Sequence, residues 1–456
     1  MCGLCGVMRQ RKAAELVAIG LHHNQHRAVD SAGIVSSNGR YLFRERGKGI
    51  AREVFKDEDT LNRLHGMAAI GHIRYATSGS EEDDKKYDNT QPICGQFHGM
   101  QIAIAHNGNI VNTEELERHV SPLERTTTMD TEFILRLLER EKSHDINHAL
   151  KNVLRMLRGS YELLILLPDR MIAVRDPHGN HPLSIGKSGD GYFVSSETCA
   201  FPSLDAEYFG EVEPGTFVTF LEHGDPIVTK FAEPALKQCV FELVYYGHPA
   251  SRISGRNVGR FRERLGTELE KEFGVPLGEI VVGIPDSANY IARGFGASGR
   301  SGEHYPAINR HHYVGRTFIA ATQAMRVLEV ANKFTFSADA VAGKIVVLID
   351  DSIVRGTTLI NVIAVLLKMG AKAVHVRIAS PPFKHPCELG INTRTYDELI
   401  ANNKTIEEIC QHIGADSLKY LSLDALKAVV GDYENFCFSC MDGSKWYETI
   451  RIDWAA

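Results

Sequence analysis

The sequence predicts a two-domain protein whose N-terminal half is α+β and whose C-terminal half is α/β. The chain has 456 residues, and a single hydrophobic core rarely grows beyond roughly 250–300 residues. Residues 2–233 contain many short β-type runs, whereas residues 234–456 alternate strand, loop and helix. We therefore expect a boundary near residue 233 and a parallel sheet in the second domain.

Within the N-terminal half, the predicted strands are short and two helices interrupt them. β-Type runs at residues 102–105, 163–167 and 192–194 predict strands. Apolar residues recur at three- and four-residue spacing over residues 13–26 and 130–141, which predicts two amphipathic helices. This half is interpreted as sheets covered by helices.

Within the C-terminal half, three apolar runs predict successive strands at residues 280–283, 344–349 and 374–378. Apolar positions after Thr357 and Thr358 predict a helix whose N-terminus faces that loop, and Gly370 is a plausible stop for it. No internal repeat or long linker separates the halves. We therefore expect them to pack closely.

Composition and charge narrow the class of protein. The chain is 43% hydrophobic and 24% charged with a formal net charge of −6, which gives no broad basic surface for nucleic acid. No apolar run approaches the roughly 20 residues that cross a bilayer, and no secretory leader precedes Cys2. The nine cysteines are interpreted as thiols or ligands. We expect a cytoplasmic protein that binds neither nucleic acid nor membrane.

Cys2 is the first candidate for chemistry. If Met1 is removed, the thiol lies beside a free α-amino group, whose ordinary pKa of about 7.7–8.0 suits a general base. Cys2 could then act as a nucleophile without a histidine partner. Two other interpretations stay open at this point: an incidental buried cysteine, or a redox or metal pair formed by Cys2 and Cys5.

Three segments, at residues 71–77, 105–110 and 128–132, combine with Cys2 into a larger pattern. Together they resemble the glutaminase domain of class II amidotransferases, an N-terminal-nucleophile hydrolase with an αββα sandwich. Taken singly, they would more often be a surface ion pair, a turn and a helix cap. In order behind Cys2, they favour a glutaminase.

This resemblance assigns roles in glutamine hydrolysis. Arg74 would hold the α-carboxylate of glutamine with its guanidinium fork, and Asp130 would pair with the α-ammonium group. Asn107, through its side-chain amide, and Gly108, through its backbone N–H, would stabilise the tetrahedral oxyanion. Water would then release glutamate from a thioester on Cys2.

A second motif is an apolar strand that ends in Asp350 and Asp351 and leads through a short loop into a helix. Carboxylates there can face ribose hydroxyls, while backbone N–H groups and threonine hydroxyls face a phosphate, since helix N-termini favour anions. Gly356 would let the backbone approach the phosphate. Arg355 would add charge or point to solvent. The alternative is a generic strand–turn–helix.

The run resembles the phosphoribosylpyrophosphate signature of type I phosphoribosyltransferases. Residues 284–288 match that family's pyrophosphate loop, and residues 313–319 match its flexible loop. The resemblance implies Mg²⁺ with Asp350 and Asp351 as oxygen donors. The implied phosphoribosylpyrophosphate-binding residues are Asp286, Ser287, Asp350, Asp351, Ser352, Arg355, Gly356, Thr357 and Thr358.

Four cysteines form a third candidate site. Cys437 and Cys440 have a two-residue spacing, and Cys239 and Cys387 add two distant thiols. Four thiolates suit iron–sulfur or zinc, but spacing alone leaves unrelated buried thiols as the simpler interpretation. Their positions resemble the four [4Fe–4S] ligands in the cluster-bearing branch of one amidotransferase family. That resemblance implies a structural role or oxygen-sensitive control of protein lifetime.

The resemblance runs nearly end to end, through residues 175–177, 195–197 and 414–422, to the family of glutamine phosphoribosylpyrophosphate amidotransferases. It implies a pentosyltransferase that begins de novo purine synthesis. Glutamine would be hydrolysed at one site, and the ammonia would displace pyrophosphate at the other to give 5-phosphoribosylamine. Residues 313–333 are the candidate wall of a closed ammonia passage. The family is usually tetrameric and inhibited by purine nucleotides.

Two alternatives remain open at the level of sequence. Residues 248–251, residues 310–313 and Ala28 depart from the family's usual residues. A divergent paralogue could therefore use the same two sites in another pathway. A non-catalytic sensor of phosphoribosylpyrophosphate with an iron–sulfur cluster is the other alternative, and intact Cys2, Arg74, Asn107 and Asp130 argue against it.

Overall fold

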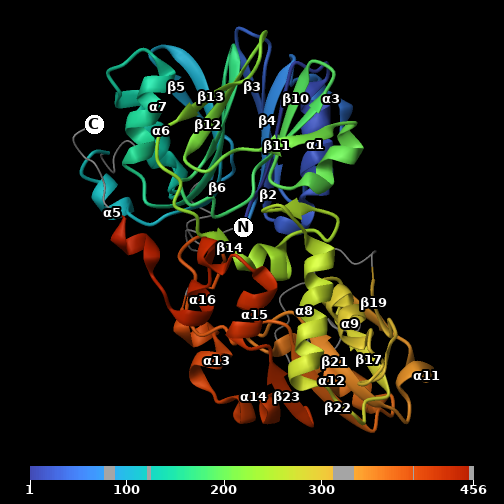
Figure 1. The fold of residues 1–456 in the computed structure, drawn as a ribbon. Coiled ribbons are helices and arrows are strands. Elements are labelled where there is room, and N and C mark those ends of the chain that lie inside the picture. Colours follow the sequence, from blue (N-terminus) through green and yellow to red (C-terminus); the bar gives the residue numbers. More distant parts are fainter. Residues whose placement is uncertain (76–87, 121–124, 312–332, 394, 451–456) are drawn as a thin grey trace.

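The computed structural model describes residues 1–75, 88–120, 125–311, 333–393 and 395–450. The predicted flexible loop at residues 313–319 and most of the proposed passage wall therefore lie outside the described residues. Figure 1 shows two lobes, the N-terminal half above and the C-terminal half below, with the N-terminus between them. None of the helices in the described ranges is long and apolar enough to span a bilayer.

The N-terminal half contains two antiparallel sheets. The seven-stranded sheet has the order β11-β9-β10-β1-β4-β2-β3 and the six-stranded sheet the order β13-β12-β8-β7-β6-β5. The first comprises β1 (Gly3–Met8), β2 (Ser31–Ser37), β3 (Leu42–Lys48), β4 (Ala68–Arg74), β9 (Ser184–Ser188), β10 (Gly191–Ser195) and β11 (Glu207–Glu211). The second comprises β5 (Ile93–Phe97), β6 (Met100–Ile110), β7 (Gly159–Leu167), β8 (Arg170–Arg175), β12 (Thr216–Leu221) and β13 (Ile227–Lys230).

The two sheets face each other and helices cover their outer faces (Figure 1). In β1, alternate residues point to opposite faces: Leu4 and Met8 enter the core between the sheets, while Val7 packs toward α1 (Ala13–His23). On the other sheet, α6 (Thr131–Arg140) and α7 (Ile146–Arg155) bury their apolar faces. These four layers confirm the predicted αββα sandwich.

The predicted helix at residues 13–26 is shorter in the structure. It ends at His23, and a 3-10 turn, η1 (Gln25–Arg27), follows. The side-chain amide of Asn24 donates to the Gly20 carbonyl and to Ser195 Oγ, both at 2.9 Å. Asn24 thus redirects the chain by bonding to the helix end and to the sheet, a contact that sequence periodicity does not reveal.

The C-terminal half is built on a parallel five-stranded sheet of order β18-β17-β21-β22-β23, as predicted. Its strands are β17 (Ile280–Gly283), β18 (Glu303–His304), β21 (Ile345–Asp350), β22 (Ala373–Ile378) and β23 (Ser417–Tyr420). Helices α8 (Val258–Phe273), α9 (Ala288–Gly296) and α15 (Leu423–Val430) share one core with this sheet, and α12 (Thr357–Lys368) and α14 (Ile406–Ile413) share another.

Shorter elements complete the described chain. They include the helices α2 (Ala51–Val54), α3 (Glu58–Asn62), α5 (Thr113–Leu116), α11 (Ala338–Val341), α13 (Ile400–Asn403) and α16 (Ser439–Asp442). The 3-10 helices are η3 (Thr198–Leu204), η5 (Tyr396–Glu398), η6 (Tyr433–Asn435) and η7 (Trp446–Thr449). Two small antiparallel pairs are β15 (Arg252–Ile253) with β16 (Arg256–Asn257) and β19 (Ile308–Arg310) with β20 (Phe334–Phe336).

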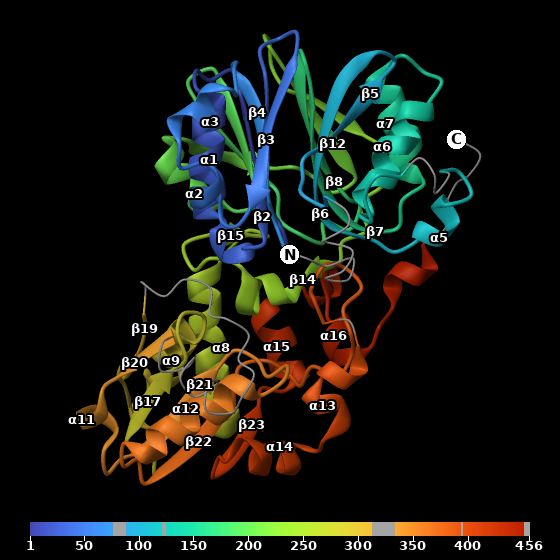
Figure 2. The ribbon, with the colours of Figure 1, turned by 180° about the vertical axis from the view of Figure 1, so that it is seen from behind.

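Two elements lie at the junction between the halves. β14 (Gln238–Cys239) pairs in parallel with β24 (Phe436–Cys437), so the end of the chain is attached beside the start of the C-terminal half. The π-helix η4 (Glu242–Tyr246) follows β14. Figure 2 shows this region from behind, between the sandwich and the parallel sheet.

Candidate active sites at the junction of the two halves

Cys2 lies directly before β1, and its backbone is held on both sides. Its N–H donates to Asn107 Oδ1 at 2.8 Å, and its carbonyl accepts from Arg27 Nε at 2.8 Å. The Tyr75 N–H points at Cys2 Sγ, with an N···S distance of 3.4 Å. The sequence predicted the thiol but not these backbone partners.

Opposing influences act on the Cys2 thiol. Burial raises the pKa of the thiol above its ordinary value, while the nearby α-ammonium group, the Tyr75 backbone and the Arg74 guanidinium lower it. Burial also lowers the pKa of the Met1 α-amino group to about 5. That amine is not the predicted base, which is the α-amino nitrogen of Cys2 itself; in this structure that nitrogen donates to Asn107 Oδ1.

The rival interpretation of Cys2 and Cys5 as a redox or metal pair is not supported by the placement of their side chains. Cys2 Sγ contacts the Tyr75 backbone, whereas Cys5 is fully buried against α1, close to Gly20. Burial raises the pKa of the Cys5 thiol to about 12. Cys5 is a packed thiol.

Asn107 and Gly108 lie in β6, beside Cys2. Asn107 Nδ2 donates to Glu162 Oε2 at 3.2 Å, which leaves its second N–H for another acceptor. Gly108 has φ +136°, and a Cβ there would lie 2.2 Å from the Ser160 carbonyl oxygen. Both its conformation and this close approach therefore require glycine. Asn107 thus contacts the backbone of Cys2, and Gly108 follows it in β6.

Arg74 and Asp130 provide opposite charges near the thiol. Arg74 is the last residue of β4 and is buried. Asp130 caps α6 by accepting from the Thr131 N–H. Its pKa is lowered although burial alone would raise it, because His106 and the N–H groups of Ile110 and Thr131 stabilise the carboxylate. Asp130 is thus both a helix cap and a partly buried anion, with its side chain 12% exposed.

A pocket of about 390 Å³ contains the Asp130 carboxylate and extends to the C-terminal half. Its other walls include Asn109 and Thr128 from the first half, and Glu388 and Gly390 from the second. Asn109 Nδ2 donates to the Glu388 carbonyl at 2.8 Å. This pocket shares Asp130 with the predicted glutamine site, but Cys2, Arg74, Asn107 and Gly108 are not among the residues that line it.

The second candidate site follows β21. Asp350 and Asp351 are both buried at the carboxyl end of this strand. Asp351 accepts from the hydroxyls of Ser287, at 2.5 Å, and Ser352, at 2.6 Å. Burial, followed by the charge of Asp351, raises the pKa of Asp350 well above its ordinary value. Two adjacent buried carboxylates suit a bound cation.

A glycine and the N-terminus of a helix follow these carboxylates. Gly356 has φ +80° and precedes α12, whose first turn contains Thr357 and Thr358. Arg355, one of the predicted phosphate-binding residues, makes an ion pair with Glu398, and its side chain is largely exposed. Asp286 pairs with Arg310 Nη1 at 2.7 Å. Arg355 and Arg310 thus each have a carboxylate partner in this structure.

The four predicted cluster cysteines converge from three separate segments. Cys239 and Cys437 are directly paired between β14 and β24. Burial raises the pKa of the Cys440 thiol well above its ordinary value, and the charges of Cys387, Cys437 and Cys239 raise it further. The Trp446 indole N–H donates to Cys437 Sγ at 3.3 Å. Within the described residues, however, no group of three or more potential ligands is arranged for a metal ion.

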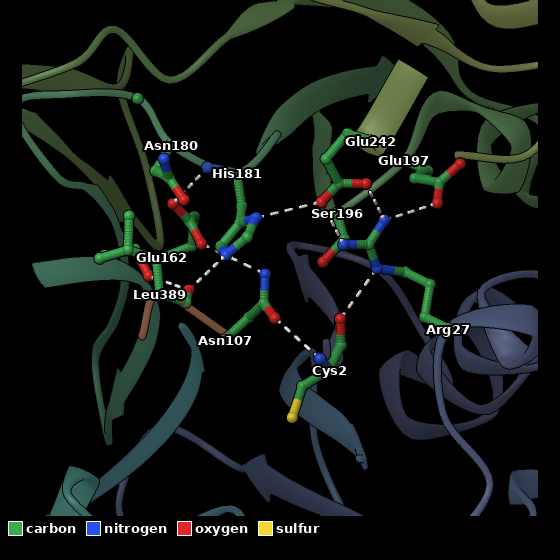
Figure 3. A network of polar contacts seen from close by, with 12 residues as sticks. Cys2, Arg27, Asn107, Glu162, Asn180, His181, Ser196, Glu197, Glu242 and Leu389 are labelled. Carbon is green, nitrogen blue, oxygen red and sulfur yellow. Dashed lines mark hydrogen bonds and ion pairs between the residues drawn. The ribbon is translucent and has the colours of Figure 1, made fainter. Parts of the chain in front are cut away.

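A buried polar network around Cys2 was missed by the sequence analysis (Figure 3). Its members include one arginine and three glutamates, Arg27, Glu162, Glu197 and Glu242, all at most 1% exposed. A usable signal exists, since Glu162 and Glu242 interrupt strongly apolar runs, and buried carboxylates require partners. Their partners are distant in sequence, which is why the pattern did not show the network.

Known proteins match the chain over most of its length. A family model for a glutamine amidotransferase domain matches residues 72–203. Amidophosphoribosyltransferases from Bacillus subtilis and Methanocaldococcus jannaschii are each 40% identical over 97% of this chain, covering 93% and 97% of those proteins. The glutamine phosphoribosylpyrophosphate amidotransferase of B. subtilis, solved with ADP and GMP, superposes with a TM-score of 0.89 at 38% identity over 97% of both chains.

Proposed function

The chain belongs to the amidophosphoribosyltransferase family, and on this premise we propose that the residues described above carry the family's reaction. The enzyme uses glutamine to aminate 5-phosphoribosyl-1-pyrophosphate and gives 5-phosphoribosylamine, glutamate and pyrophosphate, the first step of de novo purine biosynthesis. The observation that carries this conclusion is 40% identity over nearly the full length of both chains. The divergent-paralogue and sensor alternatives are not favoured.

For the glutaminase half, residues 2–233, we propose Cys2 as the nucleophile. After loss of Met1, its own α-amino group accepts the thiol proton, and the thiolate attacks the side-chain amide of glutamine. The free N–H of Asn107 and the backbone N–H of Gly108 stabilise the oxyanion. Arg74 and Asp130 bind the α-carboxylate and α-ammonium groups. Both charges act on the thiol, and Arg74 is buried, which supports these roles.

For the phosphoribosyltransferase half, residues 234–456, we propose that the β21–α12 loop binds the phosphosugar. Asp350 and Asp351 face the ribose hydroxyls, and the N-terminus of α12 with Thr357 and Thr358 receives the phosphate. Ammonia then displaces pyrophosphate at the anomeric carbon. The φ of +80° at Gly356, which L side chains rarely adopt, supports a specialised backbone at the start of α12.

Two cofactors are part of the proposal. The buried carboxylate pair of Asp350 and Asp351 is a donor set that suits Mg²⁺, which supplies charge neutralisation for the pyrophosphate leaving group. Cys239, Cys387, Cys437 and Cys440 would hold a [4Fe–4S] cluster. Their convergence and the hydrogen bond from Trp446 to Cys437 support this donor set.

Regulation, assembly and location complete the proposal. The relative solved with ADP and GMP supports purine nucleotides as ligands of this enzyme, and a homotetramer is the proposed assembly. All nine cysteines are free thiols in the structure. Unpaired thiols are typical of a reducing compartment, which supports the cytoplasm.

The test is product release by anaerobically purified protein supplied with glutamine, Mg²⁺ and phosphoribosylpyrophosphate. Wild type should release glutamate and pyrophosphate in equal amounts. Cys2→Ala should lose release from glutamine but keep pyrophosphate release with ammonia, because only the glutaminase step uses the thiol. Cys94→Ala, which removes an exposed thiol, is the matched control. Glutamate without pyrophosphate, or glutaminase activity in Cys2→Ala, would contradict the proposal.

A further inference from the structure

Hydrogen bonds around Cys2 close into a ring that passes through both halves of the molecule (Figure 3). Starting and ending at the Cys2 backbone, it runs through Arg27, Glu242, His181, Glu162 and Asn107. Five of its six members belong to the glutaminase half. Glu242, the first residue of η4, belongs to the other half.

One arm of the ring holds the carbonyl side of Cys2. Arg27 Nε donates to the Cys2 carbonyl, and its two terminal nitrogens donate to the Glu242 carboxylate at 2.7 and 3.0 Å. A guanidinium held in this bidentate way has a fixed plane and position. The carboxylate of Glu242 therefore sets where the Arg27 Nε–H points, and through it the position of the Cys2 carbonyl.

The other arm holds the oxyanion donor. The second contact of Glu242 is with His181 Nδ1 at 3.2 Å, and the His181 backbone N–H donates to Glu162 at 3.2 Å. Glu162 in turn accepts from Asn107 Nδ2, and Asn107 Oδ1 accepts from the Cys2 N–H. The Glu242 carboxylate is thus linked by hydrogen bonds to two groups. Through Arg27 it reaches the Cys2 carbonyl, and through His181 and Glu162 it reaches Asn107, the proposed oxyanion donor.

Because these side chains are buried, the loss of any one partner would leave a polar group without a hydrogen bond. The side chains of Arg27, His181 and Glu242 are each at most 1% exposed, so water cannot replace a lost partner. Arg27 also binds Glu197, whose other contacts are with His26, His248 and Ser251. Without the Glu242 charge, the guanidinium would keep only Glu197 as a charged partner, and its orientation toward Cys2 would change.

We propose that Glu242 is a positioning residue for glutamine hydrolysis, by which the phosphoribosyltransferase half aligns Cys2 and Asn107 of the glutaminase half. This inference rests on the proposed role of Cys2. It assigns to Glu242 no contact with glutamine. Its loss should therefore slow the chemical step without weakening glutamine binding.

The test is steady-state glutaminase kinetics of full-length Glu242→Gln. Gln has the same shape but supplies one acceptor in place of two charged oxygens. We expect kcat to fall at least about tenfold, because misplacement of reacting groups by about 1 Å can cost 10²-fold, with KM for glutamine unchanged within about twofold. Pyrophosphate release with ammonia should stay within about twofold of wild type, which also checks folding.

Glu270→Gln is the matched control. Glu270 is a buried glutamate of the same half that pairs with Arg300 at 2.5 Å, outside the ring. It should leave glutaminase kcat unchanged. Glu242→Asp retains the charge on a shorter side chain, and its kcat should lie between those of Glu242→Gln and wild type.

Three outcomes would overturn the inference: wild-type kcat in Glu242→Gln, a change confined to KM, or equal kcat loss in Glu270→Gln. If Glu242→Gln does not fold, Glu242→Asp decides alone, and wild-type kcat in that variant would overturn the inference. Cys2→Ala, assayed in parallel, separates this failure from failure of the proposed function. Glutaminase activity in Cys2→Ala would remove the premise instead.

Discussion

At the scale of single residues, glycine is required at Gly108 for two reasons. Its φ of +136° lies in a region that side-chain-bearing residues rarely adopt, and the Ser160 carbonyl fills the space where a Cβ would be. Gly99 shares only the first property, since its φ is +83° and no atom lies within 4 Å of an added Cβ. Comparing substitutions at Gly108 and Gly99 therefore distinguishes the effect of backbone conformation from the effect of close packing.

We therefore predict that Gly108→Ala lowers glutaminase kcat by about 10² or more, because the backbone must shift and the oxyanion donor moves with it. Gly99→Ala should cost about 1 kcal/mol in the free energy of unfolding and leave kcat unchanged. Glutamate release and urea denaturation measure the two effects. Equal kcat for both variants would show that the Gly108 backbone is not part of the site.

From the carboxylates at the end of β21, we predict that the proposed cation site lowers the stability of the cation-free protein. Burial and the charge of Asp351 raise the pKa of Asp350. When the pKa of an acid is raised in the folded state, the free energy of unfolding falls as the pH rises from the ordinary pKa to the raised pKa. The loss of stability is greatest above the raised pKa. Without a bound cation, the pair destabilises the native state.

Asp350→Asn should therefore raise the free energy of unfolding of the cation-free protein by about 1 kcal/mol, which corresponds to roughly 2–4 °C in Tm for a domain of this size. It should also abolish pyrophosphate release with either nitrogen donor. Thermal denaturation in EDTA, at pH 6 and pH 8, measures the first effect. A lower Tm for Asp350→Asn would contradict it.

The sequence motifs named several residues that lie in contact in the structure, while their roles stay predictions. Cys2 contacts Asn107, and Asp351 accepts from the Ser287 hydroxyl. Arg355 pairs with Glu398, which lies 43 residues later and which its own motif does not indicate. Glu242 was not singled out because a glutamate in an apolar run gives no sign of which distant side chains surround it.

At the scale of elements, the sequence predicted which helices and strands form better than it predicted the residues at which they end. The strands and helices of both halves formed close to the predicted positions because their apolar periodicity matches the layers that they pack against. The early end of α1 and the π-helix η4 depended on tertiary hydrogen bonds and burial. Such contacts override local propensity.

The β14–β24 pair suggests how the C-terminal segment is held. Each strand has only two residues, which is too short for independent stability. The pair places Cys239 opposite Cys437. If a cluster joins these thiols, it supplies the cross-link that the short strands cannot.

On the proposed cluster, we predict that Cys437→Ser binds less iron and exposes residues 437–450 to proteolysis, because metal–thiolate bonds would tie this segment to β14. Cys410→Ser is the control, since Cys410 Sγ donates to the Ala415 carbonyl at 3.2 Å within its own segment. Iron per chain and the rate of limited proteolysis are the measurements. Full iron content in Cys437→Ser would exclude that cysteine as a ligand.

At the scale of the whole molecule, buried charges join the two halves. Burial alone would raise the pKa of Glu242, but the charge of Arg27 and hydrogen bonds from His181 and Arg27 lower it from 4.5 to about 2. A carboxyl group with a lowered folded-state pKa stabilises the native state above its ordinary pKa. This contribution is lost as the pH falls toward about 2.

Accordingly, the free energy of unfolding of wild type should fall more steeply than that of Glu242→Gln between pH 4.5 and pH 3. The full difference over the titration is about 3 kcal/mol. Urea denaturation of the two proteins at several pH values measures it. Parallel curves would show that the Glu242 charge does not stabilise the junction.

The ring around Cys2 also has a consequence for biosynthesis. A ribosome makes Cys2 and the whole sandwich before it makes Glu242, and Glu242 is buried only when the later half has folded against the earlier one. On the proposed role of Glu242, a nascent chain would contain a folded but poorly aligned glutaminase. Glutamine would then not be consumed until an acceptor site exists, and ribosome-stalled chains that end before residue 242 should release almost no glutamate.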